Sequence, residues 1–285
     1  MLGLDVGFGW TKWWTKEKKG KFPTWIGLWE NYSISDVTPI EFEGEKYVVG
    51  EEAKFCRQKI EIVDYEDMIR FLPLIALHVS RITGVTPYEM VTGLAPKHYA
   101  KFKQDKEAQL RLNEFKRVLF QGLGVLMDME EKIKPEEGES LILVDIGFNT
   151  VDVLLLLWTG EKYKKIAIES FEGLGVKNAV ERFRERLKIE YLKGQPASKL
   201  IKIFQEGKVK IEGKEYYLNE EVKEAKQSYK EVLLTRLKEA FGERIEEAEY
   251  MIVAGGGAYL VEKLRQDALV PEEPEFSNAR GYAKA

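Results

Sequence analysis

The sequence predicts an α/β fold composed of two similar halves. The motif Asp-x-Gly-Phe occurs twice, at Asp5 and at Asp145, and each copy follows an apolar run of the kind that forms a buried strand. Such runs alternate with amphipathic helical stretches along the 285 residues, of which 44% are hydrophobic. A chain of this length and composition buries a substantial core, and the repeated motif favours two domains over one.

The later copy of the motif predicts a β-hairpin. One apolar run ends at Asp145, and a second covers residues 151–158. Between them the chain turns through Gly147, Phe148 and Asn149. Two apolar runs joined by a short glycine-containing turn are typical of paired antiparallel strands. The carboxylate of Asp145 is therefore expected at the mouth of this hairpin.

The N-terminus repeats this design. A short apolar run leads to Asp5, the chain turns through Gly7, Phe8 and Gly9, and residues 11–14 begin the return strand. The two hairpins predict two equivalent loops, one in each half of the chain.

Two such loops are suited to binding a polyphosphate. Turn amides in residues 7–10 and 147–149 form anion-binding nests when they point to one side, and glycine lets the backbone come close to a phosphate. The carboxylates of Asp5 and Asp145 suit Mg²⁺, which keeps most of its waters and bridges phosphate oxygens. Lys12 would neutralise phosphate charge.

A third glycine cluster follows another apolar strand. Residues 251–254 are apolar, Gly255, Gly256 and Gly257 come next, and a helix is expected to start near Ala258. Bare backbone at the start of a helix suits the sugar or phosphate of a nucleotide.

In their order and separation, these three segments resemble the motifs of the actin-like ATPase superfamily. Residues 5–12 resemble its phosphate-1 motif, residues 145–152 its phosphate-2 motif, and residues 255–257 its adenosine motif. The chain is similar in particular to ParM/StbA-type prokaryotic actins and to archaeal actin-like proteins.

The resemblance implies an actin-like fold, with two duplicated α/β domains and a nucleotide cleft between them. Domain I is expected to comprise residues 1–139, with the tail 271–285 packing back on it, and domain II residues 140–270. The expectation that the tail returns to domain I rests on residues 274–282, which resemble the Asn-Ala-x-Gly ending of ParM-type proteins.

The same resemblance implies a set of site residues. Nucleotide and phosphate contacts are expected from Gly7, Phe8, Gly9, Trp10, Thr11, Lys12, Gly147, Phe148, Asn149, Thr150, Gly173, Gly255, Gly256 and Gly257. Asp5 and Asp145 are the expected metal-binding residues. Asp145 and Gln121 are the expected catalytic residues. Two positions depart from the family pattern, because Phe8 replaces a small hydroxyl residue and Asn149 replaces a glycine or small residue, and these changes bear on the hydrolysis rate.

Gln121 follows a predicted strand over residues 115–120. In the family, a Gln or Glu of this connecting segment orients the attacking water, and Gln121 is the matching residue. The alternative interpretation is that Gln121 only hydrogen-bonds a turn.

Other local patterns complete the prediction. Residues 66–83 predict one helix, which Pro73 could kink, and residues 39–49 predict a hairpin. Residues 90–96 resemble the Gly-Leu-Pro loop of ParM-type proteins, and His98 after it is expected on the surface.

The function implied by the resemblance is that of a polymerising actin-like ATPase. It would bind and hydrolyse ATP with Mg²⁺, with GTP left open as the nucleotide, and form filaments. These would segregate plasmid or other DNA through a DNA-binding adaptor protein. The alternative is a non-polymerising assembly or scaffold ATPase of the pilus or division type, because polymerisation is a property of surfaces that the motifs do not encode.

Composition and missing motifs exclude other classes. A net charge of −4 argues against direct nucleic-acid binding. A P-loop and a complete dinucleotide fingerprint are missing, and two histidines with one cysteine make a zinc site improbable. Without a signal peptide or a membrane-spanning run, the expected location is the cytoplasm. The sequon at Asn31-Tyr32-Ser33 is accordingly interpreted as accidental.

Overall fold

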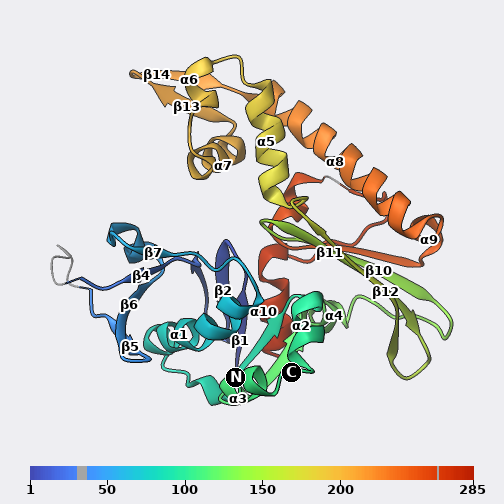
Figure 1. Ribbon diagram of the computed structural model, residues 1–285. Coiled ribbons are helices and arrows are strands. Elements are labelled where there is room, and N and C mark those ends of the chain that lie inside the picture. The colour runs from blue at the N-terminus through green and yellow to red at the C-terminus, as the bar shows by residue number, and fades with distance from the viewer. Residues whose placement is uncertain (31–36, 262) are drawn as a thin grey trace. The chain divides into compact units, whose positions relative to one another are not determined.

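The computed structural model describes residues 1–30, 37–261 and 263–285, so the sequon at residues 31–33 lies outside the described residues. The chain forms two compact units (Figure 1). Unit 1 comprises Met1–Lys134 and Pro271–Ala285, and unit 2 comprises Pro135–Val270. Each unit has its own sheet and its own hydrophobic core.

The main sheet of unit 1 has the strand order β3-β2-β1-β8-β9. Its strands are β1 (Leu2–Val6), β2 (Trp10–Trp14), β3 (Lys19–Pro23), β8 (Met90–Leu94) and β9 (Arg117–Phe120). The pairs β1–β2 and β2–β3 are antiparallel, whereas β1–β8 and β8–β9 are parallel. Every residue of β1 is buried, including the carboxylate-bearing Asp5 near its end.

A second sheet of unit 1 has the order β5-β6-β4-β7. Its strands are β4 (Ile26–Leu28), β5 (Ile40–Phe42), β6 (Glu45–Val49) and β7 (Lys59–Ile60), and a 3-10 turn η1 (Glu51–Phe55) follows β6. The hairpin predicted over residues 39–49 is confirmed as β5–β6. Its turn residues Glu43 and Gly44 have φ angles of 51° and 81°, as a tight hairpin turn requires.

The helices of unit 1 pack around the main sheet. They are α1 (Tyr65–Thr83), α2 (Pro96–Phe102), α3 (Lys106–Arg111), α4 (Leu123–Met129) and α10 (Ser277–Tyr282), with 3-10 turns η2 (Pro87–Glu89) and η4 (Pro274–Phe276). The predicted helix over residues 66–83 is confirmed, and it continues through Pro73. Asp64 caps its start by accepting from the Asp67 amide at 2.9 Å, and Gly84 ends it with φ 76°.

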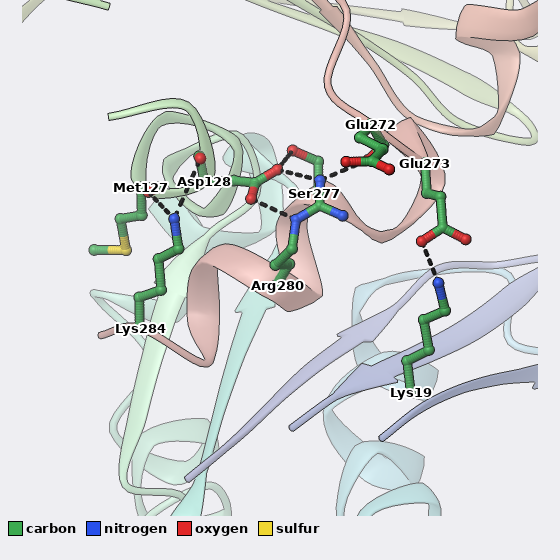
Figure 2. Close-up of polar contacts among 8 residues, drawn as sticks. All are labelled: Lys19, Met127, Asp128, Glu272, Glu273, Ser277, Arg280 and Lys284. Atoms are coloured by element: carbon green, nitrogen blue, oxygen red, sulfur yellow. Dashed lines mark hydrogen bonds and ion pairs between the residues drawn. The ribbon is translucent and has the colours of Figure 1, made fainter. Parts of the chain in front are cut away.

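The tail is fastened to unit 1 by a buried carboxylate. Asp128 at the end of α4 accepts from Arg280 Nε at 2.5 Å, from Arg280 Nη2 at 2.6 Å and from Ser277 Oγ at 2.6 Å (Figure 2). Lys284 adds donors to the carbonyls of Met127 and Asp128. Gly281 of α10 crosses α4 so closely that a side chain there would collide with the backbone of Gly124.

The main sheet of unit 2 has the order β12-β11-β10-β15. Its strands are β10 (Ser140–Ile146), β11 (Thr150–Trp158), β12 (Tyr163–Glu172) and β15 (Tyr250–Ala254), and β13 (Lys208–Ile211) pairs separately with β14 (Lys214–Tyr217). The β10–β11 and β11–β12 pairs are antiparallel, and β10–β15 is parallel. The order β3-β2-β1-β8 of unit 1 therefore recurs in unit 2, which confirms the predicted duplication.

The helices of unit 2 are α5 (Val176–Arg186), α6 (Glu190–Lys193), α7 (Ala197–Glu206), α8 (Asn219–Phe241) and α9 (Arg244–Glu247). Their apolar sides meet the β10, β11 and β15 side chains in one core, in which Phe183 and Tyr229 are fully buried. Together α5 and α8 position the loop that precedes α5, as described below.

The prediction of a helix that starts near residue 258 is wrong. The structure has a short 3-10 turn, η3 (Gly256–Leu260), and the chain then returns to the sheet. The amide of Leu269 donates to the Met251 carbonyl at 2.8 Å, and the Val253 amide donates to the Leu269 carbonyl at 2.9 Å. These bonds to β15 hold the segment away from a helical path, so tertiary pairing overrides its helical pattern.

No helix in the described parts of the chain is both long and apolar enough to span a bilayer.

Candidate functional site

The loop of unit 1 is the turn between β1 and β2. The Gly7 amide donates to the Trp10 carbonyl at 3.1 Å and closes the turn. Thr24, which follows β3, donates from its hydroxyl to the Gly7 carbonyl at 2.7 Å and from its amide to the Gly9 carbonyl at 3.1 Å. Two carbonyl groups of this loop are therefore tied to one residue, which lies just after β3.

Asp5 lies at the base of this loop and has two partners. It is only 4% exposed. Its Oδ2 accepts from Lys12 Nζ at 3.2 Å, and its Oδ1 accepts from Gln121 Nε2 at 2.9 Å. The structure thus brings together the expected metal-binding residue, the expected phosphate-neutralising lysine and the expected water-positioning residue of unit 1.

The side chains of the loop point to different surroundings. Phe8 packs edge-on against His98 with ring centroids 6.0 Å apart, and His98 meets Tyr65 in the same way at 5.7 Å. Trp10 is 41% exposed, whereas Thr11 is fully buried. The prediction of a surface histidine is wrong, because His98 is half-buried and burial lowers its pKa, so the ring is neutral near pH 7.

The equivalent loop of unit 2 joins β10 to β11. The Gly147 amide donates to the Thr150 carbonyl at 2.9 Å, which matches the Gly7–Trp10 bond of unit 1. Its carbonyls are held by the start of α5. The Val176 amide donates to the Gly147 carbonyl at 3.0 Å, and the Lys177 amide donates to the Phe148 carbonyl at 3.0 Å.

The turn before α5 completes these contacts. The Gly175 amide donates to the Asn149 carbonyl at 3.2 Å. A Cβ at Gly175 would lie 2.6 Å from the carbonyl oxygens of Gly147 and Phe148, so only glycine allows this approach. Gly173, two residues earlier, has φ 74°, and the buried Tyr229 hydroxyl donates to the Leu174 carbonyl at 2.8 Å.

Two aspartates are cross-strand partners beside this loop. Asp145 of β10 is paired with Asp152 of β11, in the position where Asp5 is paired with Lys12 in unit 1. Asp152 is 5% exposed, and its burial raises the pKa of its carboxyl to about 6, against the effect of hydrogen bonds from Ser170 and Thr150.

The three glycines after β15 lie against the end of β10. Gly255 has φ 80°, and a Cβ there would collide with the Asp145 carboxylate and the Ile146 carbonyl. A Cβ at Gly257 would collide with the Ile146 side chain. Gly256 begins η3. The predicted adenosine motif and the Asp145 hairpin are therefore adjacent within unit 2.

Each loop can present backbone amides to an anionic ligand, and in unit 1 Lys12 adds a positive charge. Among the described residues, no group of three or more His, Cys, Asp or Glu side chains forms a ready metal cage. Single carboxylates fit a hard cation such as Mg²⁺, which takes one or two protein oxygens and keeps its waters and substrate phosphates.

Comparison with family models assigns both halves. Residues 3–132 match the N-terminal domain of actin-like proteins, and residues 143–266 match the C-terminal domain of archaeal MreB-like actin homologues. This chain is an actin-like protein. The family expected from the two Asp-x-Gly-Phe hairpins is thereby confirmed, and no curated protein sequence matches the chain.

Solved structures share the fold of this actin-like protein. A ParM filament of 15 strands from Clostridium botulinum is 19% identical, with a TM-score of 0.77 over 99% of this chain and 97% of that one. A non-polymerisable quadruple mutant of pCBH ParM is 20% identical, with a TM-score of 0.73 at the same coverage. The archaeal actin homologue Ta0583 in complex with ADP is 18% identical, with a TM-score of 0.75, again at 99% and 97% coverage.

Two residues of this actin-like protein were not selected from the sequence. Asp152 follows Asp145 by the spacing at which Lys12 follows Asp5, so aligning the two hairpins would have found it. Thr24 gives no such signal, because its contacts join it to a loop that lies earlier in the chain.

Proposed function

We propose that this actin-like protein binds and hydrolyses ATP with Mg²⁺ and assembles into filaments, with GTP as the alternative nucleotide. The observation that supports this best is the pair of matching loops, Gly7–Trp10 and Gly147–Thr150. In each, the carbonyls are tied back to the fold, which leaves the amides of the same peptides directed the other way. The fold shared with an archaeal actin homologue in complex with ADP gives further support.

In this proposal each loop binds nucleotide phosphates through its backbone amides. Lys12 would neutralise phosphate charge, and Asp5 and Asp145 would hold Mg²⁺ through its water shell. Bound Mg²⁺ would supply charge neutralisation at the terminal phosphates. Gly173 and Gly255–Gly257 provide bare backbone for the sugar and base.

Two side chains serve the attacking water. Gln121 is held by Asp5 and positions the water, since an amide is too weak a base to take its proton. Asp152 is suited to accept a proton, because a carboxyl with a pKa of about 6 lies near the working pH of a general base.

Filament formation is proposed because relatives solved with the same fold include a ParM filament. By the same analogy, the filament would move plasmid or other DNA through an adaptor protein in the cytoplasm. The second candidate is a non-polymerising scaffold ATPase, which the same loops would equally serve.

Sedimentation and electron microscopy with and without ATP·Mg²⁺ test the proposal. We expect polymer in the pellet with nucleotide and monomer without it. Asp145→Asn should keep nucleotide binding and lose most turnover, whereas Asp267→Asn, on the surface of unit 2, should keep both. Monomers under saturating nucleotide would favour the scaffold ATPase, and full turnover in Asp145→Asn would refute its role.

A further inference from the structure

We propose that Thr24 is the positioning residue that aims the phosphate-binding amides of the unit 1 loop. This rests on the proposed nucleotide function. Thr24 is 3% exposed and belongs to none of the three glycine motifs. Its hydroxyl and its amide donate to the carbonyls of Gly7 and Gly9, at 2.7 Å and 3.1 Å.

Because the peptide group is planar, these two hydrogen bonds also fix the directions of the N–H groups that follow the held carbonyls. In a trans peptide the C=O and the following N–H point in opposite directions, and the structure contains no cis peptide bond among its described residues. Holding the Gly7 carbonyl toward Thr24 therefore turns the Phe8 N–H away from Thr24. Holding the Gly9 carbonyl does the same to the Trp10 N–H. One residue thus orients two donors on the opposite side of the loop.

In unit 2 the loop carbonyls are also held, but by the start of a helix. There the amides of Gly175, Val176 and Lys177 at the start of α5 hold the loop carbonyls. In the described part of unit 1, no helix start donates to the loop, and Thr24 supplies the donors instead. Both loops are closed by the same kind of bond, Gly7 to Trp10 and Gly147 to Thr150. They differ in the donors that hold their carbonyl groups.

A second buried hydroxyl strengthens the anchor. Thr11 Oγ1 lies 2.9 Å from Thr24 Oγ1, and Thr11 is fully buried. Because the Thr24 hydroxyl proton is directed to the Gly7 carbonyl, Thr11 is the donor of this pair. The resulting chain from Thr11 through Thr24 to Gly7 is polarised along its length, as linked hydrogen bonds are. Phe8, whose amide follows the Gly7 carbonyl, is also held through its side chain, because its ring packs against His98.

Hydroxyl deletions separate anchoring from simple packing. Thr24→Val keeps the shape and the amide bond to Gly9 but removes the donor to Gly7. Thr24→Ser keeps the donor. Thr92→Val is the matched control, because Thr92 is fully buried in the same sheet and its hydroxyl has no hydrogen-bond partner among the described residues.

Calorimetric titration with pyrophosphate·Mg²⁺, ATP·Mg²⁺ and adenosine gives the first readout. We expect Thr24→Val to weaken both phosphate ligands by about tenfold, the loss of roughly one charge-assisted hydrogen bond. Adenosine binding should not change. Thr24→Ser and Thr92→Val should stay within about threefold of wild type for all three ligands. Equal affinity in Thr24→Val and wild type, or equal losses in Thr92→Val and Thr24→Val, would overturn the proposal.

Hydrogen exchange of the loop without nucleotide gives the second readout. Amide exchange over residues 7–10 should accelerate in Thr24→Val and not in Thr92→Val. Unchanged exchange in Thr24→Val would overturn the anchoring role. If wild type bound neither pyrophosphate nor ATP, the proposed nucleotide function would fail, and the exchange result would still decide whether Thr24 orders the loop.

Discussion

The buried carboxylate of Asp152, beside the unit 2 loop, destabilises the native state when it is ionised. An unfolded aspartate loses its proton near pH 4, whereas the buried Asp152 carboxyl has a pKa of about 6. The native state therefore binds more protons than the unfolded state between these pH values, and stability falls as pH rises through them. Above pH 6 the cost is complete, on the order of 3 kcal/mol at about 1.4 kcal/mol per pKa unit.

Asp152→Asn should relieve this cost. We expect the variant to be more stable than wild type by about 2 kcal/mol at pH 7.5 and equal to it near pH 4, measured by urea unfolding. Turnover should fall, since the variant loses the proton acceptor. Asp267→Asn is the control of opposite sign, because the Arg265 guanidinium lowers the pKa of Asp267. A pH profile of Asp152→Asn parallel to wild type would contradict the assignment.

The role of Gln121 is tested by measuring nucleotide affinity and the rate of hydrolysis separately. Gln121→Ala should leave nucleotide affinity within about threefold of wild type and reduce turnover by roughly tenfold or more, as the loss of a positioning group does. Any filament whose disassembly follows hydrolysis should then live longer. If affinity falls while single-turnover hydrolysis stays at the wild-type rate, Gln121 is a structural residue that supports Asp5.

At the scale of elements, α4 and α10 cross at two glycines. Gly281→Ala would drive a methyl group into the Gly124 backbone, and we expect it to lower the free energy of unfolding of unit 1 by about 1–3 kcal/mol or more. Gly194→Ala is the control, since the nearest atom to its Cβ is 3.9 Å away and its φ is −78°. The control should be neutral or slightly stabilising. Equal urea midpoints for both variants would contradict the close crossing.

The tail clasp in Figure 2 depends on the fork of Arg280. Arg280→Lys keeps the charge but not the paired donors to Asp128, whose side chain is 5% exposed. We expect a loss of about 2 kcal/mol in unit 1 stability by urea unfolding. Arg236→Lys, in a pair with Glu239 that is more than half exposed, should change little. Similar losses in both variants would show that the buried fork contributes nothing specific.

At the scale of the whole molecule, each unit carries one of the two proposed phosphate-binding loops. Adding ATP·Mg²⁺ at 100 times its Kd should stabilise the protein by about 2.7 kcal/mol. Hydrogen exchange should slow in both loops together, over residues 7–10 and 147–150. Protection of one loop alone would mean that the nucleotide binds a single unit.

The sequence by itself determined the α/β class, the duplication and the actin-like family. These depend on short-range patterns, since apolar runs that end in Asp-x-Gly-Phe specify a strand and its turn locally. For the same reason, the β5–β6 hairpin and the helix α1 were predicted correctly. Pairing between separate segments carries no local pattern, and the strands β3 and β4 were missed.

Only the tertiary structure decided which groups meet. Gln121 reaches Asp5 across 116 positions of the chain, and Thr24 reaches back to Gly7. The pKa of Asp152 follows from its burial, and burial depends on all the elements packed around it. The helix expected after Gly257 gave way to pairing with β15 because hydrogen bonds between distant segments outweigh weak local propensity.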